Sequence, residues 1–389
     1  MSEPVQFNRR HLIAAAGLAP LALGAGTRAL AQSAQGQPLI GNPALPEVPG
    51  KKLRWAVVGL GSFGVGQVIP GLLAARQSRI TAFVSGNPAK MKDLGARYGV
   101  NRFYSYEDFD RIAQDKEIDC VYIVLPVGLH AEYTIRALKA GKHVLCEKPM
   151  ASTSAECEAM IAAAKAANRQ LGVAYRVHFE PTNMAAQRMI QNGEIGTLRT
   201  VGCDHGFNAD PNSWAPHKWR LQKALAGGGS MFDIGVYGVN TSLMMTGDAV
   251  TEVAAVYSYP RDDARFREVE GGVDYRMTLA NGVTIQGSSS YCFSPYASRQ
   301  RYFGSKGALT MDPATTYYDN HGYLEGNGPR REFSGGAAFQ QFAAQVDAFS
   351  EAARTNTPHR TPGEMGLRDI RLIEAIYKSA DNGGAVVKM

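Results

Sequence analysis

Four residues lie in two segments whose context suits chemistry on a bound ligand. Glu147 and Lys148 follow the apolar, strand-like run at 143–146, and open parallel sheets bind their ligands at the carboxyl ends of the strands. Asp233 and Tyr237 follow a glycine-rich stretch and are four residues apart, which would put both on one face of a helix. A Glu-Lys-Pro tripeptide is weak evidence by itself, and an isolated Asp-Tyr pair is more often a surface feature than a site.

A glycine-rich loop follows the first apolar run of the chain. The run at 53–59 is typical of a strand, and the residues that lead from it into a helical pattern are Gly59, Leu60, Gly61, Ser62, Phe63 and Gly64. The glycines permit a tight turn, and the start of a helix presents unpaired N–H groups to a pyrophosphate. Such a pattern is common by chance in a chain with 42 glycines, but its place between a strand and a helix predicts a dinucleotide site.

The end of the second predicted strand indicates which dinucleotide is bound. About twenty residues after the loop, where an acidic side chain would bind the ribose 2′-hydroxyl of NAD, the chain has Ser85 and Gly86, followed by Lys90. A hydroxyl, backbone N–H groups at a helix start and a cation together suit the 2′-phosphate of NADP. We therefore expect NADP rather than NAD, the alternative being an ordinary turn with a solvated lysine.

The elements that must position these residues alternate between strand and helix. Helical patterns separate short apolar runs at 53–59, 80–85, 120–126, 143–146 and 170–175. This alternation predicts an α/β Rossmann domain with a parallel sheet at residues 51–174. From 175 to 389 strand-like runs dominate, with a hairpin signal at 280–282. We predict an α+β domain with a large, mainly antiparallel sheet for substrate binding and oligomerisation, and fold-level analogy suits a homodimer or homotetramer.

The N-terminus has the features of an export signal. Arg9 and Arg10 precede an apolar, Gly/Ala-rich stretch, and a small-residue cleavage site lies at 29–31. We expect a twin-arginine signal peptide at 1–31 and a periplasmic protein. Residues 32–50 contain four prolines and form a Pro-rich arm, either a strap over the cofactor or a neighbouring subunit, or plain disorder. No later run reaches the roughly 18 apolar residues of a membrane span, so we expect no membrane insertion after cleavage.

The charge and the cysteines of the chain argue against nucleic-acid binding, a disulfide framework and a metal site. The net charge of the chain is +6, and because residues 1–31 carry +2 of it, only +4 remains on the rest. Without a basic cluster this is a solvated surface, and nucleic acid is not expected as a partner. The 5 cysteines are odd in number and have no CxxC spacing, so neither a disulfide framework nor a metal site is predicted.

Taken together, these segments resemble the glucose-fructose oxidoreductase and inositol dehydrogenase family from Lys52 to the C-terminus. The resemblance rests on the glycine loop, the 121–126 run with His130, the Glu-Lys-Pro motif and the 227–237 segment. The leader and the Pro-rich arm also match exported members. The resemblance implies a catalytic group of Lys148, Asp233 and Tyr237. It further implies cofactor contacts at Tyr106, Leu125, Pro126, His130, Glu147, Lys148, Arg176, Trp219 and Arg220.

This catalytic group suits the oxidation of a sugar hydroxyl by hydride transfer to a nicotinamide. A tyrosine with an ordinary pKa near 10 is a poor base at neutral pH. We expect the Lys148 ammonium to favour the phenolate of Tyr237, and Asp233 to bind a neighbouring sugar hydroxyl and to orient the lysine. Inositol dehydrogenases usually have a histidine at the position of Tyr237, so the tyrosine favours an aldose over an inositol.

Export predicts how the reduced cofactor is reoxidised. Outside the cytosol no NADP(H) pool exists, so a cofactor that dissociated in each turnover would be lost. We therefore expect tightly bound NADP(H), one aldose oxidised to its lactone, and a second aldose or ketose reduced to an alditol by ping-pong hydride transfer. One alternative is a glycoside hydrolase of the same fold with retained NAD, against which Ser85 and Lys90 argue. The other is a noncatalytic sugar-binding protein, against which the intact catalytic group argues.

Overall fold

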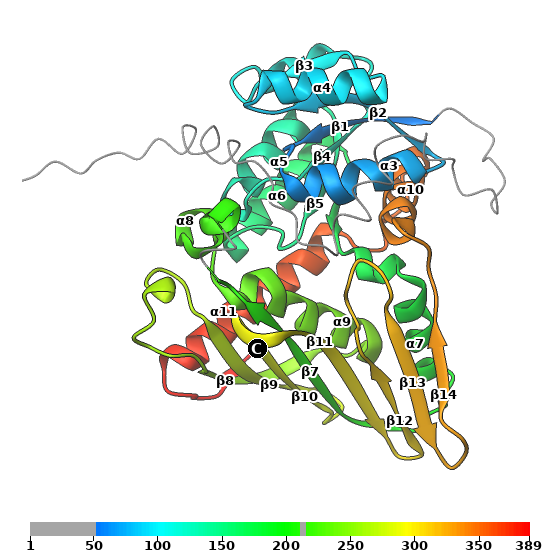
Figure 1. Ribbon diagram of the computed structural model, residues 1–389, viewed down its shortest axis with the longest axis vertical. Coiled ribbons are helices and arrows are strands. Elements are labelled where there is room, and N and C mark those ends of the chain that lie inside the picture. Colours follow the sequence, from blue (N-terminus) through cyan, green and yellow to red (C-terminus); the bar gives the residue numbers. More distant parts are fainter. Residues whose placement is uncertain (1–51, 211–214) are drawn as a thin grey trace, which may run out of the picture.

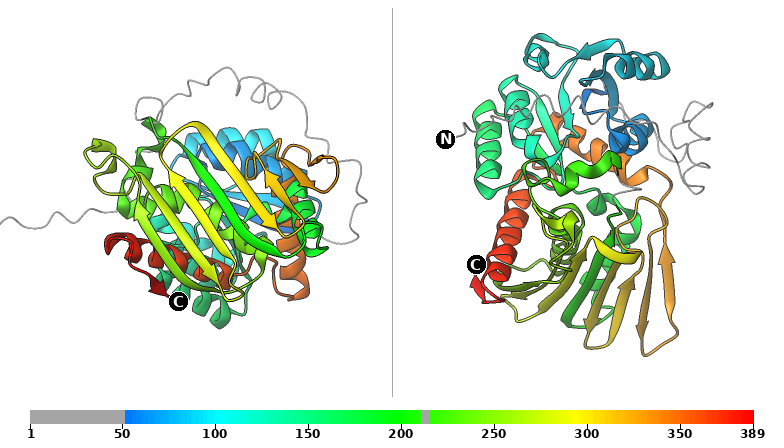
Figure 2. Two further views of the ribbon diagram at one scale, coloured as in Figure 1. Left: turned by 90° about the horizontal axis from the view of Figure 1, so that it is seen from below. Right: turned by 60° about the vertical axis from the view of Figure 1, so that its left-hand side comes forward.

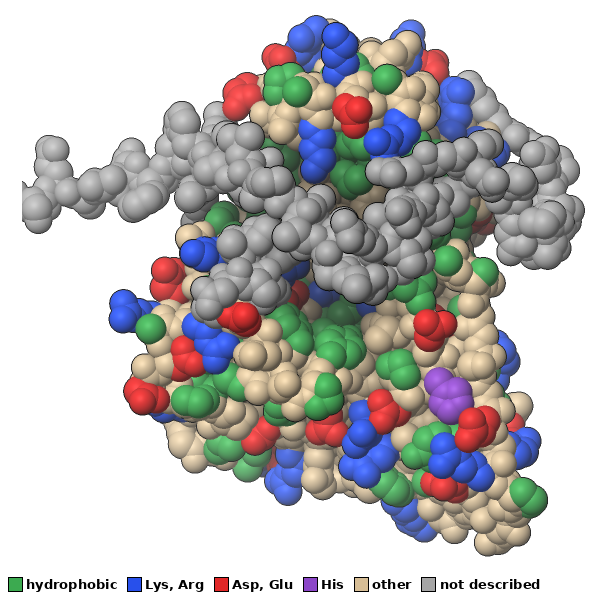
Figure 3. All heavy atoms as spheres, in the orientation of Figure 1, with side chains coloured by type: hydrophobic (Ala, Val, Ile, Leu, Met, Phe, Trp, Pro, Cys, Tyr) green, Lys and Arg blue, Asp and Glu red, His purple; other side chains and the backbone are tan. Residues whose placement is uncertain are grey.

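The computed structural model describes residues 52–210 and 215–389, and of residues 215–217 the backbone alone. The predicted signal peptide and Pro-rich arm lie outside these residues. Figure 1 shows a parallel sheet with its helices at one end of the molecule and a second, larger sheet at the other. Acidic and basic side chains are interspersed over the face drawn in Figure 3. Within the described residues, no helix combines the length and the apolarity of a membrane span.

The N-terminal domain is built on a six-stranded parallel sheet of order β3-β2-β1-β4-β5-β6. Its strands are β1 (Leu53–Val58), β2 (Ser78–Val84), β3 (Arg102–Tyr104), β4 (Cys120–Ile123), β5 (His143–Glu147) and β6 (Leu171–Ala174). The helices are η1 (Gly64–Val68), α3 (Ile69–Ala74), α4 (Pro88–Tyr98), η2 (Phe109–Gln114), η3 (Val127–Leu129), α5 (His130–Lys139) and α6 (Ser154–Ala167). The strand order reverses between β1 and β4, and ligands of such sheets bind at this crevice. The predicted Rossmann domain is confirmed.

The C-terminal domain contains a nine-stranded sheet of order β14-β13-β12-β11-β7-β10-β9-β8-β15. These strands are β7 (Leu198–Asn208), β8 (Val250–Tyr257), β9 (Gly272–Leu279), β10 (Thr284–Ser290), β11 (Cys292–Gly304), β12 (Gly307–Met311), β13 (His321–Gly326), β14 (Arg331–Ser334) and β15 (Val387–Lys388). Every pair except β7 with β10 is antiparallel, which confirms the mainly antiparallel sheet. The β9–β10 turn is the predicted hairpin.

Helices cover one face of this sheet, and the left view of Figure 2 looks onto the other face. Those that contact it are α7 (Pro181–Gln191), η6 (Met231–Gly235), α9 (Val236–Thr246) and α11 (Gly363–Asp381). The domain also contains η4 (Arg176–Phe179), η5 (Ala215–Leu221), α8 (Lys223–Ala226) and η7 (Ala264–Phe266). All residues of α9 except its last are buried, because this helix lies between the sheet and the rest of the molecule. It carries Tyr237.

Helix α10 (Gln340–Thr355) crosses the predicted domain boundary. The parallel sheet does end at Ala174, but α10 returns from the second domain to cover one of its faces. The Trp55 indole donates to Ser350 Oγ at 3.1 Å, and the Asp347 carboxylate accepts from the backbone N–H groups of Arg76 and Gln77, both at 2.8 Å. Without α10 the apolar side chains on that face would be exposed, so the first domain is completed by sequence far beyond residue 174.

The contact between α3 and α10 permits a direct test of this arrangement. A Cβ atom at Gly71 would lie 2.4 Å from Cβ of Phe342, so Gly71→Ala should push the helices apart and reduce the free energy of unfolding by about 1–3 kcal/mol. Gly66→Ala is the matched control, because no atom lies within 4 Å of the added carbon, and it should leave stability unchanged or raised by up to about 1 kcal/mol. Urea unfolding of both variants provides the measurement, and equal effects would contradict the helix contact.

Candidate active site

The glycine loop has the geometry of a pyrophosphate site. Gly59 has φ +100°, and a Cβ atom there would lie 2.2 Å from the carbonyl oxygen of Val124. A Cβ atom at Gly64 would lie 2.6 Å from the carbonyl oxygen of Gly59, whereas no atom lies within 4 Å of one at Gly61. The first backbone N–H groups of the helix that follows have no partner within the helix. The loop therefore packs tightly on its inner side and leaves open space on its outer side, which fits a dinucleotide phosphate.

The end of β2 presents a hydroxyl and a cation. Ser85 Oγ accepts from the Asn87 N–H at 3.2 Å, and Asn87 Oδ1 accepts from the Lys90 N–H at 2.9 Å, which caps α4. The Tyr106 ring lies beside Gly86, 3.4 Å from the position of a Cβ atom there. Burial lowers the pKa of Lys90, and its ammonium forms no ion pair with any residue that the structure describes. A phosphate dianion would fit this position.

His130 joins the ends of β4 and β5. One ring nitrogen lies 2.8 Å from the carbonyl oxygen of Leu125 and the other lies 2.9 Å from that of Pro149. Burial lowers the pKa of this imidazole. Because both ring nitrogens are directed at the main chain, His130 holds the two strand ends together, and its predicted contact with the cofactor stays a prediction. Leu125 lies next to the glycine loop, 3.1 Å from the position of a Cβ atom at Gly59, and the cofactor contacts predicted at Leu125 and Pro126 stay predictions.

Glu147 is turned into the protein. Its carboxylate accepts from the Tyr122 hydroxyl at 2.8 Å and from the Lys148 N–H at 3.1 Å. The Tyr122 oxygen accepts in turn from the amide of Gln345, on α10, at 3.0 Å. Burial raises the pKa of Glu147. Its side chain thus fixes the strand end that carries Lys148.

Lys148, Asp233 and Tyr237 meet between the two domains. The Lys148 ammonium donates to the main-chain oxygen of Asp233 at 2.7 Å and lies 3.8 Å from Asp233 Oδ1. The same ammonium lies 4.8 Å from the centroid of the Tyr237 ring. The structure therefore brings together the three residues that the resemblance implied, one from the end of β5 and two from consecutive helical segments, η6 and α9.

A buried glutamate that the sequence analysis missed holds the start of these helical segments. Glu270 accepts from the N–H groups of Gly229 and Met231, both at 2.8 Å, and burial raises its pKa. A Cβ atom at Gly229 would lie 1.9 Å from the carbonyl oxygen of Glu270, so the glycine stretch is required for this close approach. Glu270 lies in a loop before β9 without any local motif, and no pattern in the sequence could have identified it.

Asp233 is ionised, and its carboxylate accepts hydrogen bonds from two side chains. Its Oδ2 atom accepts from Arg220 Nε at 3.1 Å and from the Tyr291 hydroxyl at 3.2 Å. Burial by itself would raise its pKa, but the charges of Arg220 and Lys148 outweigh burial, and the pKa lies below its usual value. The Arg220 guanidinium lies 4.5 Å from the Trp219 ring centroid. The structure thus connects Arg220, expected at the cofactor, to Asp233, with the Trp219 ring beneath the guanidinium.

Tyr237 is hydrogen-bonded to a cation that the sequence analysis did not place at its hydroxyl. Arg176 Nη2 donates to the Tyr237 hydroxyl oxygen at 2.9 Å, while Lys148 lies over the face of the ring. Burial raises the pKa of Tyr237 to about 12, although Arg176 opposes this shift. Lys148 was expected to favour the phenolate; it lies over the ring, and the cation hydrogen-bonded to the phenol oxygen is Arg176. Arg176 is 4% exposed and contacts Tyr237 together with groups of the second domain, and its predicted cofactor contact stays a prediction.

Aromatic residues of the loop between β12 and β13 also reach the glycine loop. The rings of Tyr317 and Phe63 lie 5.8 Å apart, and the Tyr318 hydroxyl donates to Gln67 Oε1 at 2.7 Å. The Tyr317 ring centroid lies 4.6 Å from the Arg176 guanidinium. This loop therefore borders both the nucleotide side and the catalytic side of the site, and only the adjacent tyrosines at 317–318 would have marked it in the sequence.

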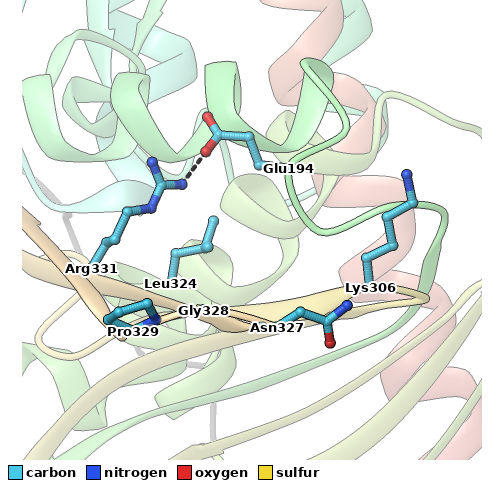
Figure 4. Close-up of a pocket in the computed structure, with 8 residues that line it drawn as sticks. Glu194, Lys306, Leu324, Asn327, Gly328, Pro329 and Arg331 are labelled. Atoms are coloured by element: carbon cyan, nitrogen blue, oxygen red, sulfur yellow. Dashed lines mark hydrogen bonds and ion pairs between the residues drawn. The ribbon is translucent and has the colours of Figure 1, made fainter.

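Elsewhere on the surface, a hollow lies beside the turn between β13 and β14. In Figure 4 Glu194 and Arg331 point toward each other across it. It is also lined by Lys306, Leu324 and the backbone of the turn, and it shares no residue with the catalytic group. In the parts of the chain that the structure describes, no cluster of three His, Cys, Asp or Glu residues could hold a metal ion.

Comparison with known proteins identifies the family. Residues 53–175 match the oxidoreductase family with an NAD-binding Rossmann fold, and residues 183–310 match the GFO/IDH/MocA C-terminal domain. An aldose-aldose oxidoreductase from Caulobacter crescentus, crystallised with glycerol, is 42% identical, with 87% of this chain and 100% of that chain covered and a TM-score of 0.82. The chain belongs to this oxidoreductase family. The resemblance seen in the sequence is confirmed.

Two further relatives have names that include a cofactor. The D-xylose 1-dehydrogenase [NADP(+)] of Haloarcula marismortui is 28% identical over 342 residues, which cover 86% of this chain and 92% of that protein. The 3-ketoreductase KijD10 from Actinomadura kijaniata, solved in complex with NADP and TDP-benzene, is 27% identical, with 85% of this chain and 98% of that chain covered and a TM-score of 0.74.

The role of Glu270 can be tested by stability. Glu270→Ala should lower the free energy of unfolding by about 1–3 kcal/mol for each of the two N–H groups left unpaired. Glu268→Ala is the matched control: Glu268 lies in the same loop, is exposed and accepts one hydrogen bond, from the Lys223 N–H at 3.2 Å. It should change stability by less than about 0.5 kcal/mol. Chemical unfolding measures both variants, and a Glu270 effect no larger than that of Glu268 would refute the capping role.

Proposed function

We propose that this protein is a sugar oxidoreductase that keeps NADP(H) bound, oxidises an aldose to its lactone and reduces a second aldose or ketose to an alditol. The observation that carries the proposal is the meeting of Lys148, Asp233 and Tyr237 beside the crevice where the parallel sheet reverses its order. The aldose-aldose oxidoreductase and xylose dehydrogenase among the relatives support a sugar substrate.

The chemistry of the site follows from its residues. A bound nicotinamide would accept a hydride from the sugar carbon and later return one to a carbonyl carbon. Tyr237 takes the hydroxyl proton in the first half-reaction and gives a proton to the carbonyl oxygen in the second. Lys148 supplies positive charge beside the reacting oxygen. The ionised Asp233 holds the lysine and offers an oxygen to a neighbouring sugar hydroxyl.

Three observations support NADP as the cofactor. The end of β2 carries the Ser85 hydroxyl and the start of α4 carries Lys90, at the position where a carboxylate would repel a 2′-phosphate. Burial lowers the pKa of Lys90, and a nearby phosphate would act in the opposite direction, because an anion favours the charged form of the lysine. Two of the relatives bind or are named for NADP. A cofactor that stays bound explains how both half-reactions use one pocket in ping-pong order.

The N-terminal residues support export as part of the proposal. Arg9 and Arg10 before an apolar stretch are the features of a twin-arginine signal, a route that transports folded proteins with their cofactor. We therefore propose a periplasmic location. We also propose a homodimer or homotetramer that uses the outer face of the nine-stranded sheet, which no described helix covers (Figure 2).

The nucleotide can be identified directly. Cofactor extracted from the purified protein should be NADP(H) by mass spectrometry. Ser85→Asp should weaken binding of NADP and shift the preference toward NAD, because a carboxylate repels the 2′-phosphate and accepts from a 2′-hydroxyl. Ser85→Ala is the control, since it removes the hydroxyl without adding charge and should retain the preference for NADP. Recovery of mostly NAD from the wild-type protein would overturn the assignment.

The two-sugar reaction gives the second test. Dialysed protein mixed with an aldose and a second sugar should form lactone and alditol in equal amounts without added nucleotide. Tyr237→Phe should retain the cofactor but lose about 100- to 10,000-fold in rate, because only the proton-carrying hydroxyl is removed. Product that appears only after nucleotide is supplied would identify an ordinary dehydrogenase that exchanges its cofactor.

A further inference from the structure

We propose that the guanidinium of Arg176, and not the ammonium of Lys148, stabilises the ionised hydroxyl of Tyr237 in the step that removes the substrate proton. Lys148 is then left to act on the oxygen of the substrate. This inference rests on the function proposed above, and it assigns the phenol and the substrate oxygen to two different cations.

The guanidinium is fixed in one orientation at the phenol. Arg176 Nη2 donates to Tyr237 Oη at 2.9 Å and to the carbonyl oxygen of Thr315 at 2.7 Å. Nη1 donates to Gln341 Oε1 at 2.7 Å and to the carbonyl oxygen of Thr316 at 3.1 Å. All of these acceptors are neutral oxygens, so the full positive charge is available to the phenol. A charge held this way needs no rearrangement when the phenolate forms.

Lys148 cannot take the same role from its position. Its ammonium is bound to the main-chain oxygen of Asp233 and lies over the Tyr237 ring, 4.8 Å from the centroid. A cation over the face of a ring interacts with the whole aromatic system, whereas the charge that appears on ionisation is concentrated at the phenol oxygen. The nearest cationic donor to that oxygen is the Arg176 guanidinium.

Of the other groups that face Tyr237, some oppose ionisation and others supply no positive charge. Glu147 on β5 and Tyr296 on β11 raise the pKa of Tyr237, and burial has the largest effect in the same direction. His205 on β7 stacks against the ring with centroids 6.4 Å apart, and burial lowers its pKa to about 3, so it is neutral. Tyr317 is neutral and Asp233 is negative. Arg176 is therefore the charge that makes a phenolate accessible.

The two half-reactions depend on Tyr237 in opposite ways. In oxidation the C–H hydrogen would leave with its two electrons for a bound nicotinamide, the electron pair of the broken O–H bond would form the C=O bond, and the proton would go to the phenolate of Tyr237. In reduction the same atoms would move in reverse, and the proton would come from the neutral phenol. Because both directions pass through a transition state in which Tyr237 is partly ionised, removing the charge of Arg176 should slow both half-reactions at neutral pH.

Single-turnover kinetics of the loaded full-length protein test how the charge of Arg176 affects the rates of the two half-reactions. Reduction of bound NADP by an aldose and oxidation of bound NADPH by a ketose are followed separately between pH 5 and pH 10. Because removal of a nearby opposite charge shifts a pKa by about 1–3 units, Arg176→Gln should slow oxidation about 10- to 1,000-fold at neutral pH and move its profile to higher pH. Reduction should slow by a comparable factor, because the phenol that donates the proton becomes a weaker acid.

Two further variants separate charge from structure. Arg176→Lys retains the charge and should restore most of the oxidation rate. Arg360→Gln removes a surface guanidinium that donates to Gln187 at 3.0 Å and should alter neither half-reaction. An unchanged pH profile of oxidation in Arg176→Gln, or failure of Arg176→Lys to recover any of the lost rate, would overturn the inference.

A measurement without turnover makes the test independent of the proposed function. A fluorinated tyrosine, whose phenol is more acidic, is placed at position 237 of the full chain and titrated by fluorine NMR without nucleotide. Its transition should move to higher pH in the Arg176→Gln background, and an unmoved transition would contradict the inference. If the wild-type protein performs neither half-reaction, the proposed function fails while this titration still decides the role of Arg176.

Discussion

The site depends on holding two cations around one buried tyrosine. Removing a charge from water is costly unless it is compensated, and the structure compensates both with oxygens. Lys148 is bound to the main-chain oxygen of Asp233, and Arg176 is bound to those of Thr315 and Thr316. The end of β5 must therefore deliver Lys148, and η6 and the loop before β13 must each deliver carbonyl groups, to fixed points.

Helix α10 connects the two sides of this arrangement. Gln341 and Gln345 are one helical turn apart; the first accepts from Arg176 and the second donates to Tyr122, the partner of Glu147. Asp347 anchors the same helix to the loop before β2. One helix therefore supports the phenol side, the lysine side and the Rossmann sheet together, so a displacement of α10 would affect all three. This is the physical reason why the first domain is completed by a distant segment of the chain.

The sequence predicts those parts of the molecule that have local patterns. The alternation of strands and helices, the glycine loop and the hairpin before β10 could be read from residues that are neighbours in the chain. The convergence of Lys148 with Tyr237 required the family resemblance. Pairs such as Arg176 with Gln341, 165 residues apart, and the cap by Glu270 could not be predicted, because they arise from tertiary packing that leaves no periodic signal.

A single tyrosine that serves two opposite half-reactions must be neither too strong nor too weak an acid. General acid–base catalysis is most efficient when the pKa of the group lies near the working pH. Burial raises the pKa of Tyr237 to about 12, and this value already includes the opposing effect of Arg176. Arg176 donates to the phenol oxygen at 2.9 Å, so without its charge the pKa would lie higher still and the phenolate would be harder to form. In the proposed function, the balance between burial and this one charge therefore determines how fast the pocket performs oxidation and reduction.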